Sequence, residues 1–178
     1  MAGFSFCPMC GGAFRATMLR AGEPERLVCQ ACGFVYYVDP KVAVATIIRL
    51  GDDQAVVLVR RAIEPGYGKW VFPGGYLDRG EVVEQAAIRE AREEVGLDVQ
   101  LDGLVGIYSY PGRTPIVIVY AASSPKVETL TVTDEESLEA RAFAPAEIPW
   151  ADLAFRSTEE ALRDYLAGRV WPAATVGK

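Results

Sequence analysis

Apolar residues follow two different spacings along this chain, and each spacing predicts one kind of element. Nearly continuous apolar runs at 42–50 and 55–60 are typical of strands that are buried on both faces. Further strands are predicted at 14–19, 26–28, 99–110, 115–122 and 138–143, where apolar-rich segments lie between Gly, Pro or acidic turns. Strands that alternate with a small number of helices are compatible with an α/β domain, but they do not select one architecture.

Helical spacing occurs in two places. A turn is expected at Gly74-Gly75. After it, apolar residues recur as a stripe that would dock one helix on a core, and its members are Ala87, Ile88, Ala91 and Val95. Gly96 is expected to cap the end of this helix. A second helix is expected over 158–167, with Ser157 as its N-cap, after a helical turn at 145–148.

The first helix also carries carboxylates that lie close together on its surface. Glu90, Glu93 and Glu94 fall within roughly 100° of the helix circumference, beside the apolar stripe. Carboxylates next to a buried seam repel one another and lose solvation, so they need a compensating charge. A hard divalent cation such as Mg²⁺ supplies it, because it prefers oxygen ligands. The alternative is a solvated acidic helix face, which is what most charge runs are.

The spacing of residues 75–97, which read GYLDRGEVVEQAAIREAREEVGL, resembles the signature of the Nudix hydrolases. The matching positions are Gly75, Glu81, Arg89, Glu90, Ala91, Glu93, Glu94, Gly96 and Leu97. Ala91 stands where the signature usually has a bulkier aliphatic residue, which affects packing and not chemistry. A match of this length is far more specific than a lone glycine-rich loop, and it favours the metal site over the solvated face.

The resemblance implies an α/β/α sandwich with a mixed sheet and a pyrophosphate-cleaving centre that uses Mg²⁺ or Mn²⁺. The metal ligands that it implies are Glu90, Glu93, Glu94 and the carbonyl of Gly74. Arg89 would orient this cluster with Glu81 as its partner, because an arginine fork holds a carboxylate in one geometry. Such metal ions neutralise pyrophosphate oxygens and lower the pKa of a bound water.

All four cysteines lie in the first 32 residues, as two C-x₂-C pairs made of Cys7, Cys10, Cys29 and Cys32. This spacing predicts a structural Zn²⁺ site, which four thiolates would close completely. Disulfides or free thiols are the alternatives, but a short segment has little core of its own, and a cytosolic setting disfavours disulfides. The resemblance here is to a zinc ribbon. We expect a ribbon at 1–38, a Nudix domain at 39–170 and a tail at 171–178.

Composition narrows the chemistry and the partners. The net charge of −6 argues against a nucleic-acid footprint, and histidine is absent, which excludes histidine bases and Ser-His or Cys-His schemes. The N-terminal residues lack a signal-peptide pattern and no apolar run is long enough to span a membrane, so we expect a cytoplasmic protein. The expected partner is a small-molecule nucleotide, and the sequence does not decide whether the protein forms a homodimer.

Several residues outside the motif are weaker candidates. The additional acidic group that family members often use would be Glu135, Glu136 or Glu139, and the sequence does not choose among them. Phosphate could be clamped by Arg60, Arg61 or Arg113, and an aromatic base or flavin could stack on Trp70, Tyr76, Tyr108 or Phe155. Surface charge and ordinary core or rim packing are the alternatives for all of them.

The ribbon and the motif together resemble two Nudix subgroups. NADH pyrophosphatases carry a Ser-Gln-Pro-Trp-Pro-Phe-Pro segment after the motif, and residues 98–125 contain nothing like it. ADP-ribose/FAD pyrophosphatases are similar in the ribbon, in the W-x-x-P-x-G-Y-L segment and in the run near 137–157. This favours hydrolysis of FAD or ADP-ribose with release of AMP. NADH or dinucleotide hydrolysis and a non-catalytic ligand or RNA sensor are the alternatives.

Overall fold

The computed structural model describes residues 4–51, 55–113, 115–124, 130–132 and 135–172. The chain divides into two compact units, Met1–Asp39 and Pro40–Lys178. Each unit is described by itself below. Among the described residues, no helix is long and apolar enough to cross a membrane.

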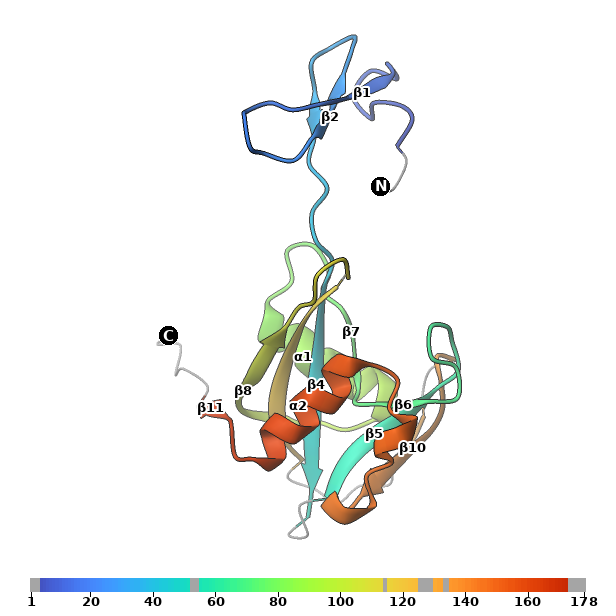
Figure 1. Cartoon of the computed structure of the whole chain (residues 1–178). Coiled ribbons are helices and arrows are strands. Elements are labelled where there is room, and N and C mark those ends of the chain that lie inside the picture. The colour runs from blue at the N-terminus through green and yellow to red at the C-terminus, as the bar shows by residue number, and fades with distance from the viewer. Residues whose placement is uncertain (1–3, 52–54, 114, 125–129, 133–134, 173–178) are drawn as a thin grey trace, which may run out of the picture. The chain divides into compact units, whose positions relative to one another are not determined.

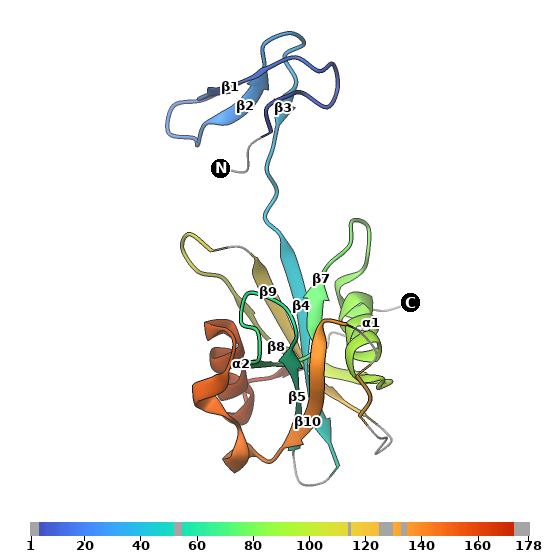
Figure 2. The same cartoon turned by 90° about the vertical axis from the view of Figure 1, so that its right-hand side faces the viewer.

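The first unit is a three-stranded antiparallel sheet with very little apolar interior. Its strands are β1 (Phe14–Thr17), β2 (Arg26–Cys29) and β3 (Val35–Tyr36), paired in that order. Strands β1 and β2 are labelled in Figure 1, and β3 is labelled in Figure 2. Cys7 and Cys29 are the buried residues among the part of this unit that the structure describes, whereas large apolar side chains such as Phe6 and Met9 are exposed. Burial of apolar side chains therefore contributes little to the stability of this unit.

The second unit is built on one mixed sheet. Its strands are β4 (Val42–Leu50), β5 (Ala55–Arg61), β6 (Trp70–Val71), β7 (Gly74–Tyr76), β8 (Gln100–Tyr108), β9 (Ile116–Ser123), β10 (Ser137–Phe143) and β11 (Trp171–Pro172). The main path is β10-β5-β4-β9-β8-β11, with β6 paired to β5 and β7 paired to β4. Only the β4–β9 pair is parallel among these described pairings. The expected mixed sheet is thus confirmed.

Two helices cover the opposite faces of this sheet. Helix α1 (Val83–Val95) lies on one side and α2 (Arg156–Leu166) on the other, with the sheet seen between them in Figure 2. Two 3₁₀ turns, Pro145–Glu147 and Trp150–Asp152, lead into α2. The α/β/α sandwich that the resemblance implied is therefore confirmed.

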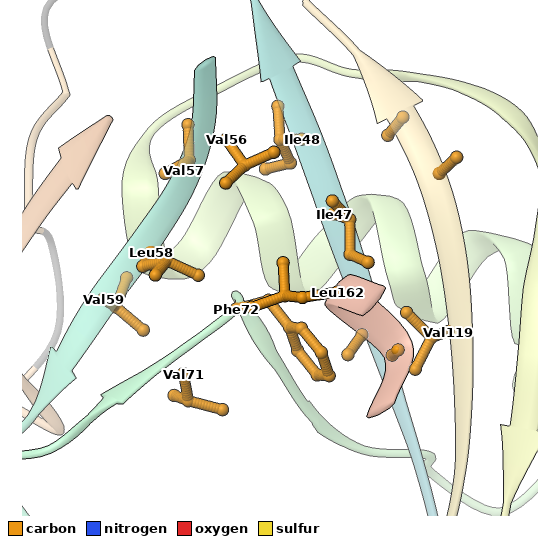
Figure 3. Packing of buried hydrophobic residues seen from close by; sticks show 14 of the residues in the cluster. Ile47, Ile48, Val56, Val57, Leu58, Val59, Val71, Phe72, Val119 and Leu162 are labelled. Atoms are coloured by element: carbon orange, nitrogen blue, oxygen red, sulfur yellow. The ribbon is translucent and has the colours of Figure 1, made fainter. Parts of the chain in front are cut away.

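Strand β4 is buried on both faces, as its continuous apolar run predicted. On the α1 side, Val44 packs with Ala86, Ala87 and Tyr120. The larger cluster includes Ile47, Val119 and Leu162, and it is shown in Figure 3. Strand β4 therefore packs in both core clusters, which holds it in place. Strand β7 pairs with β4, so its backbone is held in a defined position beside α1.

Two local predictions about the helices are wrong. Ser157 does not cap α2: the helix begins at Arg156, its N-cap is Phe155, and Ser157 is buried inside the first turn. Ile88 is 37% exposed, and Ala86 takes its place in the buried stripe of α1. Both residues have the right type for the role we expected, and tertiary packing decided otherwise. Gly96 does cap α1, with φ 71° and its N–H bonded to the Arg92 carbonyl.

Candidate active site

The Gly74-Gly75 pair is not the turn that the sequence indicated. It lies in β7, where Gly74 is opposite Ala45 and Gly75 is opposite Val44 on β4. Glycine is required here by close approach: a Cβ on Gly75 would lie 2.6 Å from both Glu90 carboxylate oxygens. A Cβ on Gly74 would lie 2.3 Å from the Val44 carbonyl oxygen. The two glycines let β7 fit between β4 and the acidic part of α1.

The register of β7 turns backbone polar groups toward α1. Leu77 N–H donates to the Val42 carbonyl, and Thr46 N–H donates to the Pro73 carbonyl. Between these two bonds, the backbone N–H and C=O groups of successive β7 residues point alternately toward β4 and away from it. Gly74 and Tyr76 belong to the non-hydrogen-bonded pairs of this ladder, and their N–H and C=O groups point away from β4. Consistent with this, Gly74 N–H donates to Glu94 Oε2 at 2.9 Å and the Tyr76 carbonyl accepts from Arg89 at 3.5 Å.

Arg89 is the hub of the acidic cluster. Its Nε and Nη2 donate to the two carboxylate oxygens of Glu81 at 2.8 and 3.0 Å, a bidentate pair. Its Nη1 donates to Glu90 and to Glu93, both at 2.8 Å. One guanidinium therefore holds three carboxylates that are up to 12 residues apart along the chain.

The same contacts set the pKa values of the cluster. Hydrogen bonds from Arg89 lower the pKa of Glu81, and Glu81 in turn is the main cause of a raised pKa for Arg89. Burial raises the pKa of Glu90, whose side chain is only 12% exposed, although Arg89 opposes the shift. Glu90 is thus a carboxylate whose negative charge is not fully compensated by the protein alone.

The chemistry of this donor set suits a hard divalent cation, although the carboxylate oxygens of Glu90, Glu93 and Glu94 do not converge on one point in the structure. Glu90, Glu93 and Glu94 offer carboxylate oxygens, and the Gly74 carbonyl is on the same edge of β7 as the N–H that contacts Glu94. In the structure, Glu90 and Glu93 are turned to Arg89, while Glu94 is turned to Gly74. The Glu93 side chain is 57% exposed, which leaves it room to rotate toward an ion.

The four cysteines form a second donor set, in the other unit. Their Sγ atoms lie within 4.8 Å of one another. In the part of the chain that the structure describes, no other group of three or more Asp, Glu, Cys or His side chains brings its ligand atoms this close together. The Cys7–Cys32 and Cys10–Cys29 sulfurs are 3.8 and 3.5 Å apart. A tetrahedral Zn²⁺ with bonds of about 2.3 Å needs sulfurs about 3.8 Å apart. Hydrogen bonds, first of all from the Cys32 backbone, lower the pKa of Cys29 to about 6. The pKa of Cys32 is raised, against a lowering hydrogen bond at the Phe34 backbone, by its contacts with the Cys10 and Cys29 thiols, so the thiolate is favoured at Cys29 and not at Cys32.

The weaker candidates are placed as follows. Arg60 and Glu139 pair with each other across β5 and β10, at 3.2 Å. Trp70 packs edge-on against Phe143, with ring centroids 4.9 Å apart, so its position is explained by the core. Arg113 is exposed beside the turn at Pro111 and Gly112, and Glu135 and Glu136 are exposed just before β10. The pairs of Arg60 with Glu139 and of Trp70 with Phe143 lie outside the Arg89 cluster.

Two interacting residues were missed by sequence reasoning. Tyr120 is buried on the α1 side of the sheet, and its hydroxyl donates to Glu84 at 3.3 Å in the first turn of α1. Lys41 places its Nζ 4.7 Å from the centre of the Tyr76 ring. Neither residue lies in the motif: the packing of α1 on the sheet brings Tyr120 to Glu84, and the register of β7 against β4 brings Tyr76 to Lys41.

Comparisons with known proteins show the family of this chain. Residues 39–165 match the family model described as NUDIX domain, and residues 5–38 match the one described as Nudix N-terminal. The chain belongs to the Nudix family. A crystal structure of a NUDIX hydrolase from Nitrosomonas europaea superposes with a TM-score of 0.85 and 33% identity, over 93% of this chain and 92% of that one.

Relatives with named activities are similar over parts of their length. An ADP-ribose pyrophosphatase of Methanocaldococcus jannaschii is 42% identical over 44% of this chain and 46% of its own length. The NAD-capped RNA hydrolase NudC of Stutzerimonas stutzeri is 30% identical over 81% of this chain and 49% of its own length. This Nudix chain therefore spans a little under half the length of these two relatives.

Proposed function

We propose that this Nudix protein is a Mg²⁺-dependent pyrophosphohydrolase that cleaves a nucleoside diphosphate joined to another group. The observation that carries the proposal is the Arg89 hub, which holds Glu81, Glu90 and Glu93 beside the Gly74 edge of β7. An arginine that organises three carboxylates next to glycine backbone suits a cationic centre for phosphate chemistry. A purely structural cluster would not need the bare backbone that Gly74 and Gly75 present.

The residues divide into ligands and a positioning pair. Glu90, Glu93, Glu94 and the Gly74 carbonyl would hold Mg²⁺ or Mn²⁺. A bound ion of this kind neutralises pyrophosphate oxygens and lowers the pKa of its water. Arg89 orients the carboxylates, and Glu81 orients Arg89 through its bidentate pair. Glu139 is already engaged by Arg60, which favours Glu135 or Glu136 as the additional acidic group.

The proposed substrates are FAD, which would yield FMN and AMP, and ADP-ribose, which would yield ribose 5-phosphate and AMP. The similarity to an ADP-ribose pyrophosphatase and the missing NADH-type segment support them. The second candidate is a dinucleotide of the NADH type, which the longer similarity to the NudC relative supports. Four sulfurs that lie within 4.8 Å of one another support a structural Zn²⁺ in the first unit.

The test is a side-by-side measurement of kcat/KM for FAD, ADP-ribose, NADH, a diadenosine polyphosphate and a nucleoside triphosphate with Mg²⁺. We expect FAD or ADP-ribose to give the highest value, with released AMP as product. If NADH or the triphosphate is preferred by more than about tenfold, the substrate assignment is wrong. If the wild-type protein turns over none of these compounds with Mg²⁺, the enzymatic proposal itself fails.

A further inference from the structure

Tyr76 and Lys41 form a cation–aromatic pair beside the glycine strand. The Lys41 ammonium lies 4.7 Å from the centre of the Tyr76 ring, within the range of a cation–π contact. Tyr76 nevertheless keeps 53% of its surface exposed. An exposed tyrosine beside a cation offers both a stacking surface and a positive charge.

The register of β7 determines on which face of the sheet this pair lies. Gly75 faces α1, because a Cβ on it would meet the Glu90 carboxylate. Side chains alternate along a strand, so the Tyr76 ring lies on the other face, where α2 covers the sheet further along. The Cα atoms of Gly74 and Tyr76 are two strand residues apart, about 7 Å. Tyr76 is therefore a near neighbour of the proposed metal edge, on the opposite face.

Packing closes part of the α1 face to the nucleoside of a bound substrate. Beside β7 this face is filled, since Ala86 and Ala87 are fully buried against Val44, and a Cβ added to Gly75 would meet the Glu90 carboxylate. The face that carries the exposed Tyr76 is open to the groups attached to a pyrophosphate held at Gly74 and Glu94. The flexible Lys41 stem lets its ammonium meet a phosphate without moving the backbone.

We propose that Tyr76 and Lys41 form the nucleotide subsite of this enzyme: Tyr76 stacks on the aromatic base of the substrate, and Lys41 binds the phosphate attached to that nucleoside. This inference rests on the proposed pyrophosphohydrolase function and deepens it. It assigns the AMP half of FAD or ADP-ribose to one side of the sheet. Stacking tolerates several aromatic rings, so this subsite accepts adenine and related bases alike.

The first experiment measures equilibrium binding of AMP and of adenosine to the full chain with Mg²⁺ by titration calorimetry. Tyr76→Leu should weaken both ligands about 3- to 10-fold, as expected for a lost aromatic stack, and Tyr76→Phe should bind nearly as well as wild type. Lys41→Gln should weaken AMP by a similar factor and leave adenosine unchanged, because only AMP carries the phosphate. Unchanged AMP binding in both Tyr76→Leu and Lys41→Gln would overturn the subsite.

The second experiment compares kcat/KM for ADP-ribose with that for a diphosphate diester that carries ribose on both phosphates and no base. Tyr76→Leu should lower the first value about 3- to 10-fold and leave the second unchanged. Equal losses on both substrates would mean that Tyr76 supports the metal site and not the base. If wild type turns over neither compound, the proposed reaction fails, while the AMP titration still tests the subsite.

Trp171→Leu is the matched control. Trp171 is 58% exposed, close to the exposure of Tyr76, and it lies on β11 at the edge of the same sheet. Strand β11 is three strand positions from β4, which is about 14 Å in a sheet. The variant removes an equally exposed aromatic ring, and we expect no change in AMP binding. A loss equal to that of Tyr76→Leu would show that the effect is not specific to the subsite.

Discussion

The two units of this chain, the ribbon unit (Met1–Asp39) and the Nudix unit (Pro40–Lys178), differ in what fills their interiors. In the ribbon unit the sulfurs of four cysteines converge, while large apolar side chains such as Phe6 and Met9 are exposed. In the Nudix unit a continuous apolar core fills both sides of the sheet, and the carboxylates of the candidate site are spread around Arg89. Four sulfurs close a metal site, whereas carboxylates around an arginine leave positions for substrate and water.

This difference separates a metal that would make structure from a metal that would make chemistry. The ribbon has little to fold around without an ion, because its interior is so small. The Nudix unit can fold through its core and bind an ion afterwards. Each of the following changes should therefore affect one unit and spare the other.

The largest effect is expected from Cys29→Ser. Structural zinc contributes roughly 10–16 kcal/mol of binding energy in small zinc domains, so loss of one buried ligand should disorder residues 4–38. Elemental analysis should fall from about one zinc per chain toward zero, and hydrogen exchange in the ribbon should accelerate. Pyrophosphohydrolase activity should persist in part. A reduced, metal-free and well-protected ribbon in the wild-type protein would contradict this prediction.

Leu162→Ala tests the opposite dependence. Leu162 is fully buried where α2 packs on the sheet, and such truncations cost about 2–5 kcal/mol. Denaturant unfolding of the Nudix unit should shift accordingly, while zinc content stays at the wild-type value. If Leu162→Ala released zinc, the two units would not be independent in stability.

Glu94→Gln should remove catalysis and keep the fold. The change deletes one charge from the carboxylate that Gly74 N–H contacts, and we expect kcat to fall by at least about 100-fold, roughly 2.7 kcal/mol. Thermal unfolding should change little. The isosteric control is Glu159→Gln, on an exposed helix pair with Arg163, which should leave kcat unaffected. Near-normal kcat of Glu94→Gln at saturating Mg²⁺ would refute the assignment.

The smallest effect concerns alkaline pH and the seam between β8 and α2. Burial first, and then the hydrogen bond to Asp164, raise the pKa of Tyr108 well above its usual value. A raised folded-state pKa means that the stabilisation is complete below about pH 10, the unfolded value, and is lost as the pH rises further. Tyr108→Phe should cost about 1 kcal/mol near neutral pH, and this difference should shrink above pH 10.

The free energy of unfolding of wild type and of Tyr108→Phe should be measured between pH 8 and pH 11, at steps of about half a pH unit. These measurements follow how the difference between the two proteins changes with pH. Tyr67→Phe is the control, because Tyr67 lies on an exposed loop. A constant difference between wild type and Tyr108→Phe across this range would argue against the role of the Asp164 hydrogen bond.

The sequence by itself determined the elements and the chemistry that depend on local spacing. Two C-x₂-C pairs predicted the four-cysteine cluster, since each pair brings two sulfurs together within one turn of chain. The continuous run at 42–50 predicted β4, and the spacing after Gly75 predicted a helix with Glu90, Glu93 and Glu94 on one side. These features follow from the periods of strands and helices, which short segments already express.

Only the tertiary structure decided how these parts meet. Gly74 and Gly75 looked like a turn, but the register of β7 against β4 makes them a strand that approaches Glu90 closely. Ser157 has the side chain of an N-cap, yet packing buries it inside α2. Lys41 reaches Tyr76 for the same reason: β4 and β7 are neighbours in space and distant in sequence. Local spacing carries no information about strand register, because register is set by which faces the whole fold buries.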